Sequence, residues 1–284
     1  MTVMPELPEV ENVCLGLADS VVGRRVERVT VRRMDVVHGP GSPTDLLRGR
    51  IIRRIDRLGK QFALVGQTPG HNGPSDKRAC VCLHLGMTGS MRFYPQNTPY
   101  RPDDHTHVVW RLSGGGRLAF RDPRRFGGLW TFDTVTALNE TRWSKLGEDA
   151  LTITPARLHM KLKRTRRPIK SALLDQATVA GLGNIYADEL LFSCGLHPMR
   201  PGCDVTRPET QRLVRKMRAL LNRAINLGGS TLRDYVDTSG RSGGFQKAHR
   251  VYGRKGQACH NCRRALSGIY LSGRATVYCG VCQT

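Results

Sequence analysis

The sequence contains no apolar run of the roughly 18 to 20 residues that a membrane-spanning helix requires. It also lacks a basic start followed by an apolar stretch, so no secretory signal peptide is expected. We therefore expect a soluble globular protein located in the cytoplasm. In that compartment the nine cysteines are expected to remain reduced, which excludes a disulfide-rich secreted fold.

Acidic residues are scarce. The chain has 23 Asp and Glu against 45 Lys and Arg, which gives a formal net charge of +22 and a pI near 10.4. This excess is larger than solubility requires and predicts a polyanionic partner, DNA or RNA. Charge alone does not distinguish an enzyme from a basic protein that only adheres to polyanions. The length of 284 residues, 39% of them hydrophobic, allows two compact domains.

The first half of the chain has the pattern of a β-rich domain. A helix is predicted from Pro8 to about Val22, because apolar residues recur there at helical spacing. Short β-branched or alternating runs follow at 26–31, 51–55, 61–65, 79–85 and 107–112, with the glycines at 114–116 as a hairpin turn. These runs predict a β-sandwich or barrel, and the Gly/Pro-rich stretch 66–75 is interpreted as a surface loop.

The second half is predicted to be helical from about residue 138. Helices are expected near 154–162, 169–176, 185–194 and 209–227, and Thr206 with Glu209 forms a capping box before the last one. The stretch 237–256 is rich in glycine, serine and basic residues, so it is interpreted as mobile and too polar to contribute to a core. No internal repeat is found in the chain.

Four cysteines near the C-terminus have the spacing of a zinc site. The pattern is Cys259-x2-Cys262-x16-Cys279-x2-Cys282, in which two turns each present two thiolates to a tetrahedral metal. Four thiolates leave no open coordination position, so one structural Zn²⁺ is predicted that holds together a tail too small to fold alone. The His-x-Glu and Pro-Cys-x-x-Cys pattern of the zinc base deaminases is absent.

A Gly181-Leu-Gly183-Asn184 segment precedes one of the predicted helices. Free backbone N–H groups and the helix dipole at such a position can hold a phosphate group. A Gly-x-Gly turn of this kind is commonly only structural, and it is the high positive charge of the chain that favours phosphate binding here.

Seven ordered segments of the chain resemble those of the bacterial formamidopyrimidine-DNA glycosylases. They are residues 5–11 (PELPEVE), 59–60 (GK), 84–90 (HLGMTGS), 122–127 (DPRRFG), 181–187 (GLGNIYA), 251–256 (VYGRKG) and 273–279 (GRATVYC). The resemblance implies a bifunctional base-excision repair enzyme. Such an enzyme flips out and removes oxidised purines, among them 8-oxoguanine and formamidopyrimidines, and then cleaves the strand by β,δ-elimination. It implies damaged double-stranded DNA as the partner and a monomeric protein.

The same resemblance implies an α+β fold with three parts. Residues 1–136 are expected to form an N-terminal catalytic β-sandwich flanked by helices, and residues 137–236 a helix-two-turn-helix DNA-binding domain. Residues 237–284 are expected to hold a lesion-recognition loop and the four-cysteine zinc β-hairpin. These expectations agree with the strand and helix patterns described above.

The resemblance also assigns catalytic roles. Pro5 matches the family nucleophile, and Glu6 matches the acid/base that assists departure of the base and opening of the sugar ring. Lys60 matches the lysine that contacts lesion and phosphate, and Arg274 matches the hairpin arginine that supports the final elimination. Without the other motifs, Pro5 and Glu6 would be interpreted as a helix lead-in, and Lys60 and Arg274 as surface charges.

The nucleophile must be a free amine. An α-amino group has a pKa of about 7.7–8.0, against about 10.4 for a lysine side chain, so it is neutral more often near pH 7. In the family the proline exposed by removal of methionine attacks C1′ of the sugar. This matches Pro5 only if Met4 is the working start, so we expect the active protein to begin at Pro5.

Further residues are implied to bind DNA. Flipping out a nucleotide leaves a hole that proteins fill with side chains, and Met87, Arg124 and Phe126 match the family's void-filling set. The remaining candidates are phosphate contacts and one position in the loop that closes over the flipped base: His105, Asn184, Arg164, Arg166 and Tyr252.

Two other classes of protein remain open at this stage. A non-catalytic DNA-binding protein would keep the helical domain and the zinc hairpin but would form no imine with DNA. An RNA-binding zinc-ribbon protein would explain the charge and the cysteines but not the Pro5–Glu6 opening. The related endonuclease VIII enzymes, which prefer oxidised pyrimidines, usually have glycine in place of Leu7 and lack the segment at 84–87, so the purine interpretation is favoured.

Overall fold

The computed structural model describes residues 4–39, 45–70, 74, 77–230 and 243–284. The chain divides into two compact units: a sandwich unit of residues 1–145 and 228–243, and a helical unit of residues 146–227 and 244–284. Within the part of the chain that is described, no helix is both long and apolar enough to span a membrane. The domain boundaries drawn from the sequence at 136 and 236 remain predictions.

The sandwich unit is built from two sheets, as the sequence predicted. One sheet has the strand order β2-β9-β5-β4-β3 and the other β1-β7-β8-β6. The bounds of the strands are β1 Val26–Val31, β2 Val37–His38, β3 Ile51–Leu58, β4 Gln61–Gln67, β5 Ala79–His84, β6 Ser90–Tyr94, β7 Thr106–Leu112, β8 Arg117–Arg121 and β9 Gly128–Phe132. All neighbouring strands pair antiparallel except β2 and β9.

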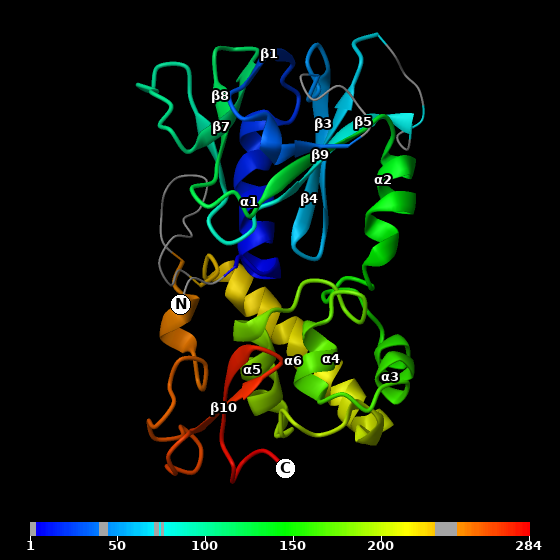
Figure 1. Cartoon of the computed structure of the whole chain (residues 1–284), viewed down its shortest axis with the longest axis vertical. Coiled ribbons are helices and arrows are strands. Elements are labelled where there is room, and N and C mark those ends of the chain that lie inside the picture. The colour runs from blue at the N-terminus through cyan, green and yellow to red at the C-terminus, as the bar shows by residue number, and fades with distance from the viewer. Residues whose placement is uncertain (1–3, 40–44, 71–73, 75–76, 231–242) are drawn as a thin grey trace. The chain divides into compact units, whose positions relative to one another are not determined.

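Two helices complete the core of this unit. Helix α1 (Leu7–Val21) buries Val10, Val13 and Leu17 in a cluster that includes residues from both sheets, such as Phe62 and Trp110. Helix α2 (Val135–Thr141) covers β5 and β9 and packs on a second cluster around Val65, Cys80 and Cys82. Figure 1 shows α2 alongside β5. The α1 stripe was predicted from its 3.6-residue period, whereas α2, two turns long, was not.

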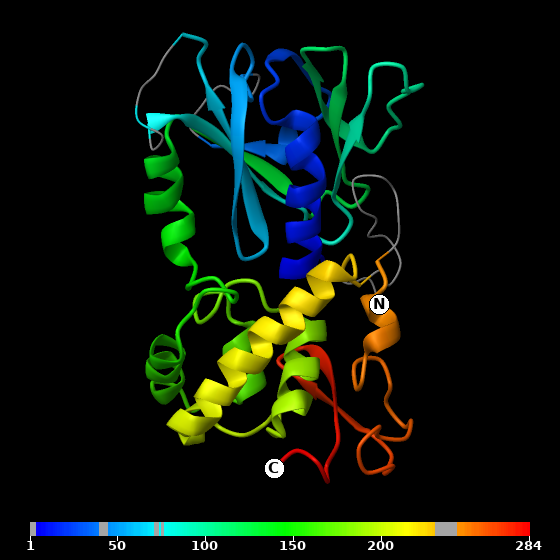
Figure 2. The ribbon, with the colours of Figure 1, turned by 180° about the vertical axis from the view of Figure 1, so that it is seen from behind.

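The helical unit contains α3 (Pro155–Lys163), α4 (Ile169–Leu174), α5 (Asn184–Cys194) and α6 (Arg207–Asn226). The predicted capping box begins α6: the Thr206 N–H donates to Glu209 Oε2 at 2.8 Å, and the Glu209 N–H donates to Thr206 Oγ1 at 3.4 Å. Figure 2 shows α6 crossing α5, and the two helices pack against each other. Short 3-10 helices occur at Met34–Val36, Trp143–Lys145, Gly202–Asp204 and Phe245–Ala248.

A two-stranded hairpin ends the helical unit, with β10 at Ser267–Leu271 and β11 at Arg274–Tyr278. Its turn residues, Ser272 and Gly273, have φ values of 50° and 71°, the left-handed conformation that a tight two-residue hairpin turn needs. The Lys170 ammonium from α4 and the Asp188 carboxylate from α5 form a fully buried ion pair at 2.6 Å. Lys170 also donates to Thr276 Oγ1 at 2.7 Å, so the pair fixes β11 to the helices.

One expectation about this unit was wrong. Residues 244–256 contribute to its core, although the stretch 237–256 had been expected to be too polar to do so. Phe245 is 1% exposed and lies 5.5 Å from Tyr186 between ring centroids, and Val251 is fully buried beside the cysteine cluster. The segment reaches the core through Phe245 and Val251, and His249 between them is also buried and packs edge-on against the rings of Phe245 and Tyr252. The rest of that predicted stretch, 237–242, lies outside the described residues.

Candidate active site and nucleic-acid interface

The predicted nucleophile and acid/base stand at the start of α1. Pro5 is buried, and Glu6 occupies the N-cap position and is 1% exposed. Pro8 lies in the first helical turn, where backbone N–H groups make no hydrogen bond within the helix, so the lack of an N–H on proline costs nothing. A carboxylate at a helix N-terminus is stabilised by the helix dipole, so the fold holds the Glu6 carboxyl at a position that tolerates its negative charge.

Glu9, which was quoted only within the segment 5–11 and was given no role, organises this opening. Its Oε2 accepts a hydrogen bond from the Glu6 N–H at 2.9 Å, and its Oε1 accepts one from the Ser230 N–H at 2.7 Å. At Gly229, where φ is +77°, a Cβ would lie 2.7 Å from Glu9 Oε1. A side chain at 229 would therefore push the returning chain away from the start of α1.

Lys60 lies in the tight turn between β3 and β4, directly after Gly59. Arg57 joins this turn to α1: its Nη1 donates to the Gly59 carbonyl at 3.0 Å, and its Nε forms an ion pair with Glu11. Packing of α1 against β3 makes the same connection through apolar side chains. The lysine turn is thus anchored to the helix that begins with Pro5 and Glu6.

His84, at the end of β5, is a residue that the sequence analysis quoted within a motif but gave no role. Burial and then the positive charges of Lys60 and Arg142 lower the pKa of His84 to about 4, while the Asp122 carboxylate opposes this shift. The imidazole is therefore neutral at pH 7. It marks a place where the lysine turn and the loop that begins at Asp122 come close to each other.

The lowered pKa of His84 predicts acid sensitivity. In the unfolded chain the imidazole binds a proton near pH 6.5, but in the folded protein only near pH 4, so protonation favours unfolding between these values. The contribution is fully present above pH 6.5 and is lost as the pH falls towards 4, a total of about 3 kcal/mol. Urea unfolding at pH 7, 5.5 and 4 should show this loss in the wild type and a smaller one in His84→Gln. If the free energy of unfolding fell equally with pH in the two proteins, this prediction would be contradicted.

Two turns of the sandwich unit carry the predicted void-filling residues. Met87 is half-buried in the turn between β5 and β6, while Arg124 and Phe126 are exposed in the turn between β8 and β9. Phe126 is 55% exposed, which is unusual for a phenylalanine, and the Arg124 guanidinium lies 4.5 Å from its ring centroid. His105 is exposed, and its carbonyl accepts the Asp122 N–H at 3.0 Å, which places it beside the second turn.

The helical unit holds the remaining candidates. Asn184 begins α5, and its Nδ2 donates to the Ala275 carbonyl at 2.9 Å, so it lies beside the exposed Arg274 at the hairpin turn. Arg164 and Arg166 are exposed, and neither forms an ion pair with any residue that the structure describes. Such basic side chains are available to phosphate groups.

Tyr252 is placed by a carboxylate that the sequence did not reveal. The Glu189 side chain, 3% exposed on α5, accepts hydrogen bonds at 2.8–2.9 Å from the N–H groups of Arg250, Val251 and Tyr252. Glu189 lies in the same helix as Asn184, which fixes both positions to one rigid element. Its only sequence signal was that it follows the Gly181–Ala187 motif.

The four predicted cysteine ligands cluster. Their Sγ atoms all lie within 4.8 Å of one another, with Cys259 and Cys282 at 4.0 Å and Cys262 and Cys279 at 3.5 Å. A zinc ion with bonds of about 2.3 Å to four sulfurs would hold them about 3.8 Å apart. The Asn261 and Cys282 N–H groups each donate to a cysteine sulfur at 3.4 Å, as expected for thiolates. The donor set therefore fits a tetrahedral metal site.

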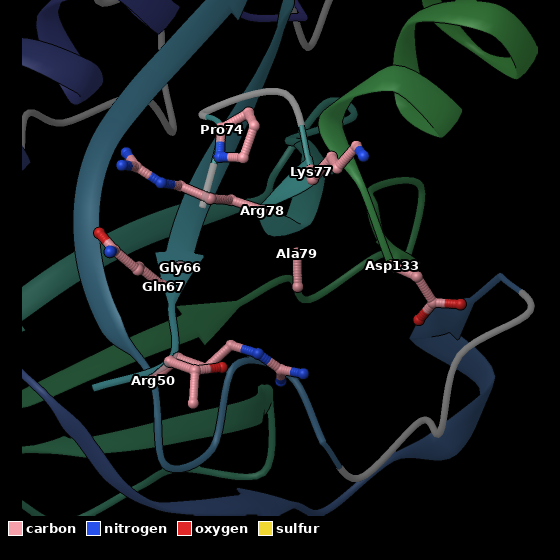
Figure 3. Close-up of a pocket in the computed structure, with 9 residues that line it drawn as sticks. Arg50, Gly66, Gln67, Pro74, Lys77, Arg78, Ala79 and Asp133 are labelled. Carbon is pink, nitrogen blue, oxygen red and sulfur yellow. The ribbon is translucent and has the colours of Figure 1, made fainter. Parts of the chain in front are cut away.

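A cavity of about 250 Å³ lies elsewhere on the sandwich unit (Figure 3). Arg50 and Arg78 lie on opposite sides of it, and Asp133 stands at one edge. None of the candidate residues lines it. The candidate residues of the sandwich unit instead lie in turns and at the start of a helix, as expected for a protein whose ligand is a long polymer.

The fold and these residues define a class: a nucleic-acid-processing enzyme that combines a β-sandwich, a helix-two-turn-helix segment and a four-cysteine hairpin. The family model of the formamidopyrimidine-DNA glycosylase N-terminal domain matches residues 4–129, and that of the H2TH domain of the same family matches residues 146–236. The chain therefore belongs to the formamidopyrimidine-DNA glycosylase family, which consists of DNA glycosylases that also cleave abasic sites.

Individual relatives agree along the whole chain. The formamidopyrimidine-DNA glycosylase of Gluconobacter oxydans is 39% identical over 285 residues, covering 99% of this chain and 100% of the relative. The solved MutM (FPG) protein of Thermus thermophilus is 38% identical with a TM-score of 0.83, covering 98% of both chains. A Lactococcus lactis FPG mutant solved with DNA containing Fapy-dG is 30% identical with a TM-score of 0.85, covering 98% of this chain and 99% of its own.

Proposed function

We propose that this chain removes oxidised purines from double-stranded DNA through an imine formed by Pro5 and then cleaves the strand by β,δ-elimination. The observation that carries this proposal is the position of Pro5 and Glu6, buried side by side at the N-terminus of α1 with Glu9 holding the Glu6 backbone. The DNA complexes solved for the Lactococcus lactis protein support DNA as the partner.

The covalent chemistry follows from the properties of a free secondary amine. The Pro5 nitrogen attacks C1′ of the sugar, the bond from C1′ to the base breaks, and the amine proton is released. Opening of the sugar ring gives an iminium ion, which makes the C2′ proton acidic. Loss of that proton breaks the C3′–O3′ bond, and a second elimination breaks the C5′–O5′ bond. Hydrolysis of the imine then frees the enzyme.

Three further residues have roles in this sequence. Glu6 acts as the acid/base that protonates the leaving group or the ring oxygen and later accepts a proton. Lys60 contacts the phosphate and lesion, which is consistent with the anchoring of its turn to α1 by Arg57. Arg274, exposed at the hairpin turn, stabilises the departing phosphate.

The remaining candidates bind and shape the DNA. Met87, Arg124 and Phe126 fill the space left by the flipped nucleotide, while His105, Asn184, Arg164, Arg166 and Tyr252 hold phosphates or the loop over the base. A structural Zn²⁺ held by the four cysteines would stabilise the hairpin that carries Arg274. The boundaries at 136 and 236 are proposed as the limits of the catalytic and helical domains.

The test is incision of end-labelled duplexes that carry 8-oxoguanine, a formamidopyrimidine, an oxidised pyrimidine or a preformed abasic site. The proposal expects preferential cleavage at the purine lesions, with phosphate groups left on both ends of the gap. Preferential cleavage at the oxidised pyrimidine would instead support the endonuclease VIII specificity. Binding without any incision would support a non-catalytic DNA-binding protein.

Replacing Glu6 should separate the two halves of the reaction. Glu6→Gln removes the proton donor needed for base departure, so excision of 8-oxoguanine should fall by roughly 10²–10⁴-fold. Cleavage of a preformed abasic site should fall less, because its base has already left. Glu140→Gln, at an exposed position of α2, is the matched control and should leave both rates unchanged. Equal losses on the two substrates would assign Glu6 a purely structural role.

A further inference from the structure

The two turns that carry Met87 and the Arg124–Phe126 pair run side by side. The first leads from β5 to β6 and the second from β8 to β9. Strands β5 and β9 are neighbours in one sheet, and β6 and β8 are neighbours in the other. Both turns therefore cross between the two sheets of the sandwich at the same place, where the chain has left the hydrogen-bond ladders and needs other contacts to hold it.

A single hydroxyl joins the two turns. Thr88 Oγ1 donates to Asp122 Oδ1 at 2.5 Å and accepts a hydrogen bond from the Arg124 N–H at 3.2 Å. The other oxygen of Asp122 accepts the Gly127 N–H at 2.7 Å. Asp122 is fully buried, so its carboxylate has exchanged water for these donors and loses stabilisation if one is removed. We refer to Thr88 and Asp122 as the clasp.

The backbones of the two turns approach each other closely, at positions where only glycine fits. A Cβ on Gly86, where φ is +62°, would lie 2.4 Å from the Gly127 nitrogen, and a Cβ on Gly127 would lie 2.6 Å from the His84 carbonyl oxygen. The Asp122 carbonyl also accepts a hydrogen bond from His107 Nε2 at 2.8 Å. The clasp thus adds side-chain hydrogen bonds to a place where the backbones of the two turns are already in contact.

We propose that Thr88 is a positioning residue for nucleotide flipping, which acts by holding Met87 and the Arg124–Phe126 pair as one rigid wedge. This inference rests on the proposed function, because it presumes that those three side chains enter the DNA stack. Unstacking a base costs a few kcal/mol, which the wedge must offset. If the turns were loosely held, binding would also have to order the wedge, and less free energy would remain to offset the cost of unstacking the base.

The substitution that tests the clasp is Thr88→Val, which preserves the shape of the side chain and removes only its hydroxyl. It leaves Asp122 Oδ1 without its donor and the Arg124 N–H without its acceptor. Thr88→Ser retains the hydroxyl and is the rescue variant. Thr141→Val is the matched control, because Thr141 also loses a hydroxyl hydrogen bond, to the Ala137 carbonyl on α2 at 2.6 Å.

Three measurements are made on the full-length, metal-loaded proteins. The first is single-turnover excision of 8-oxoguanine from a duplex, and the second is flipping, followed by the fluorescence of 2-aminopurine beside the lesion. The third is borohydride trapping on a single-stranded oligonucleotide with an abasic site, where there is no paired base to displace. Thr88→Val should slow excision and flipping by roughly tenfold, the scale of one hydrogen bond to a charged group, and should trap as well as wild type.

Rescue by Thr88→Ser and normal rates for Thr141→Val complete the expected result. The inference is overturned if Thr88→Val flips and excises at the wild-type rate. It is also overturned if trapping on the single strand falls as much as excision, because the hydroxyl would then support the site in general rather than the wedge. Failure of the proposed function is distinguishable, since wild type itself would then give no trapped complex.

Discussion

A form of the protein whose first residue is Pro5 should form a borohydride-trapped complex with abasic DNA, and a form that carries residues 1–4 should not. A proline inside a chain is a tertiary amide, whose nitrogen has neither basicity nor a free lone pair to attack C1′. The difference in trapping rate should be roughly a thousandfold or more, the scale on which enzymes lose a covalent nucleophile. Both forms keep α1 and the Glu9 contacts, so DNA binding should change far less.

The two forms are compared after intact-mass and N-terminal analysis has established which residue comes first in each. Pro5→Gly, made in the form that begins at residue 5, should also lose trapping more than binding, because it replaces the secondary amine and loosens the helix start. If the form with residues 1–4 still gives a trapped complex, the Pro5 mechanism is wrong. Lys60 would then be the candidate nucleophile, and Lys60→Ala should abolish trapping.

The sequence predicted the elements that have a strong period or a strong cap. The apolar stripe of α1, the Thr206–Glu209 box of α6 and the β-branched run of β1 were all found where they were expected. Strand β8 was indicated only by the hairpin turn at 114–116 that joins it to β7. Strands β6 and β9 were not predicted, because each is only five residues long and owes its conformation to pairing with strands that are distant in the sequence. Helix α2 was missed for the same reason, since it is stabilised by packing on β5.

The candidate site divides in the same way. Residues within short motifs could be named from the sequence, among them Pro5, Lys60 and the four cysteines, and of these the structure brings the cysteines into one cluster. What the sequence could not supply were the buried carboxylates that hold backbone N–H groups: Glu9 at Ser230, Glu189 at residues 250–252 and Asp122 at Gly127. Glu9 and Ser230 are 221 positions apart and Glu189 is 61–63 positions from its partners, so no local pattern records these contacts. Asp122 and Gly127 lie within one quoted segment, but its letters do not show which backbone N–H the carboxylate binds.

Loss of the metal should separate DNA binding from the imine chemistry. We expect Cys279→Ser to lose bound zinc and to weaken binding to an undamaged duplex by roughly tenfold or more, because structural zinc sites hold small domains together. Cys279 follows β11 directly, and β11 begins with Arg274, so loosening the cysteine cluster frees one end of the strand that presents the arginine. The buried Lys170–Asp188 pair still holds the middle of that strand, which limits the damage to the hairpin.

The measurement pairs zinc content with duplex affinity at fixed salt and with trapping at saturating abasic DNA. Trapping should stay near the wild-type rate, since Pro5, Glu6 and Lys60 belong to the sandwich unit and the cysteines to the helical unit. Cys203→Ser is the matched control, because Cys203 is a half-buried cysteine of the same unit outside the cluster. A zinc-free Cys279→Ser protein that binds duplex as tightly as wild type would show that the hairpin needs no metal. If the trapping rate fell as much as the duplex affinity, the hairpin would be needed for imine formation as well as for DNA binding.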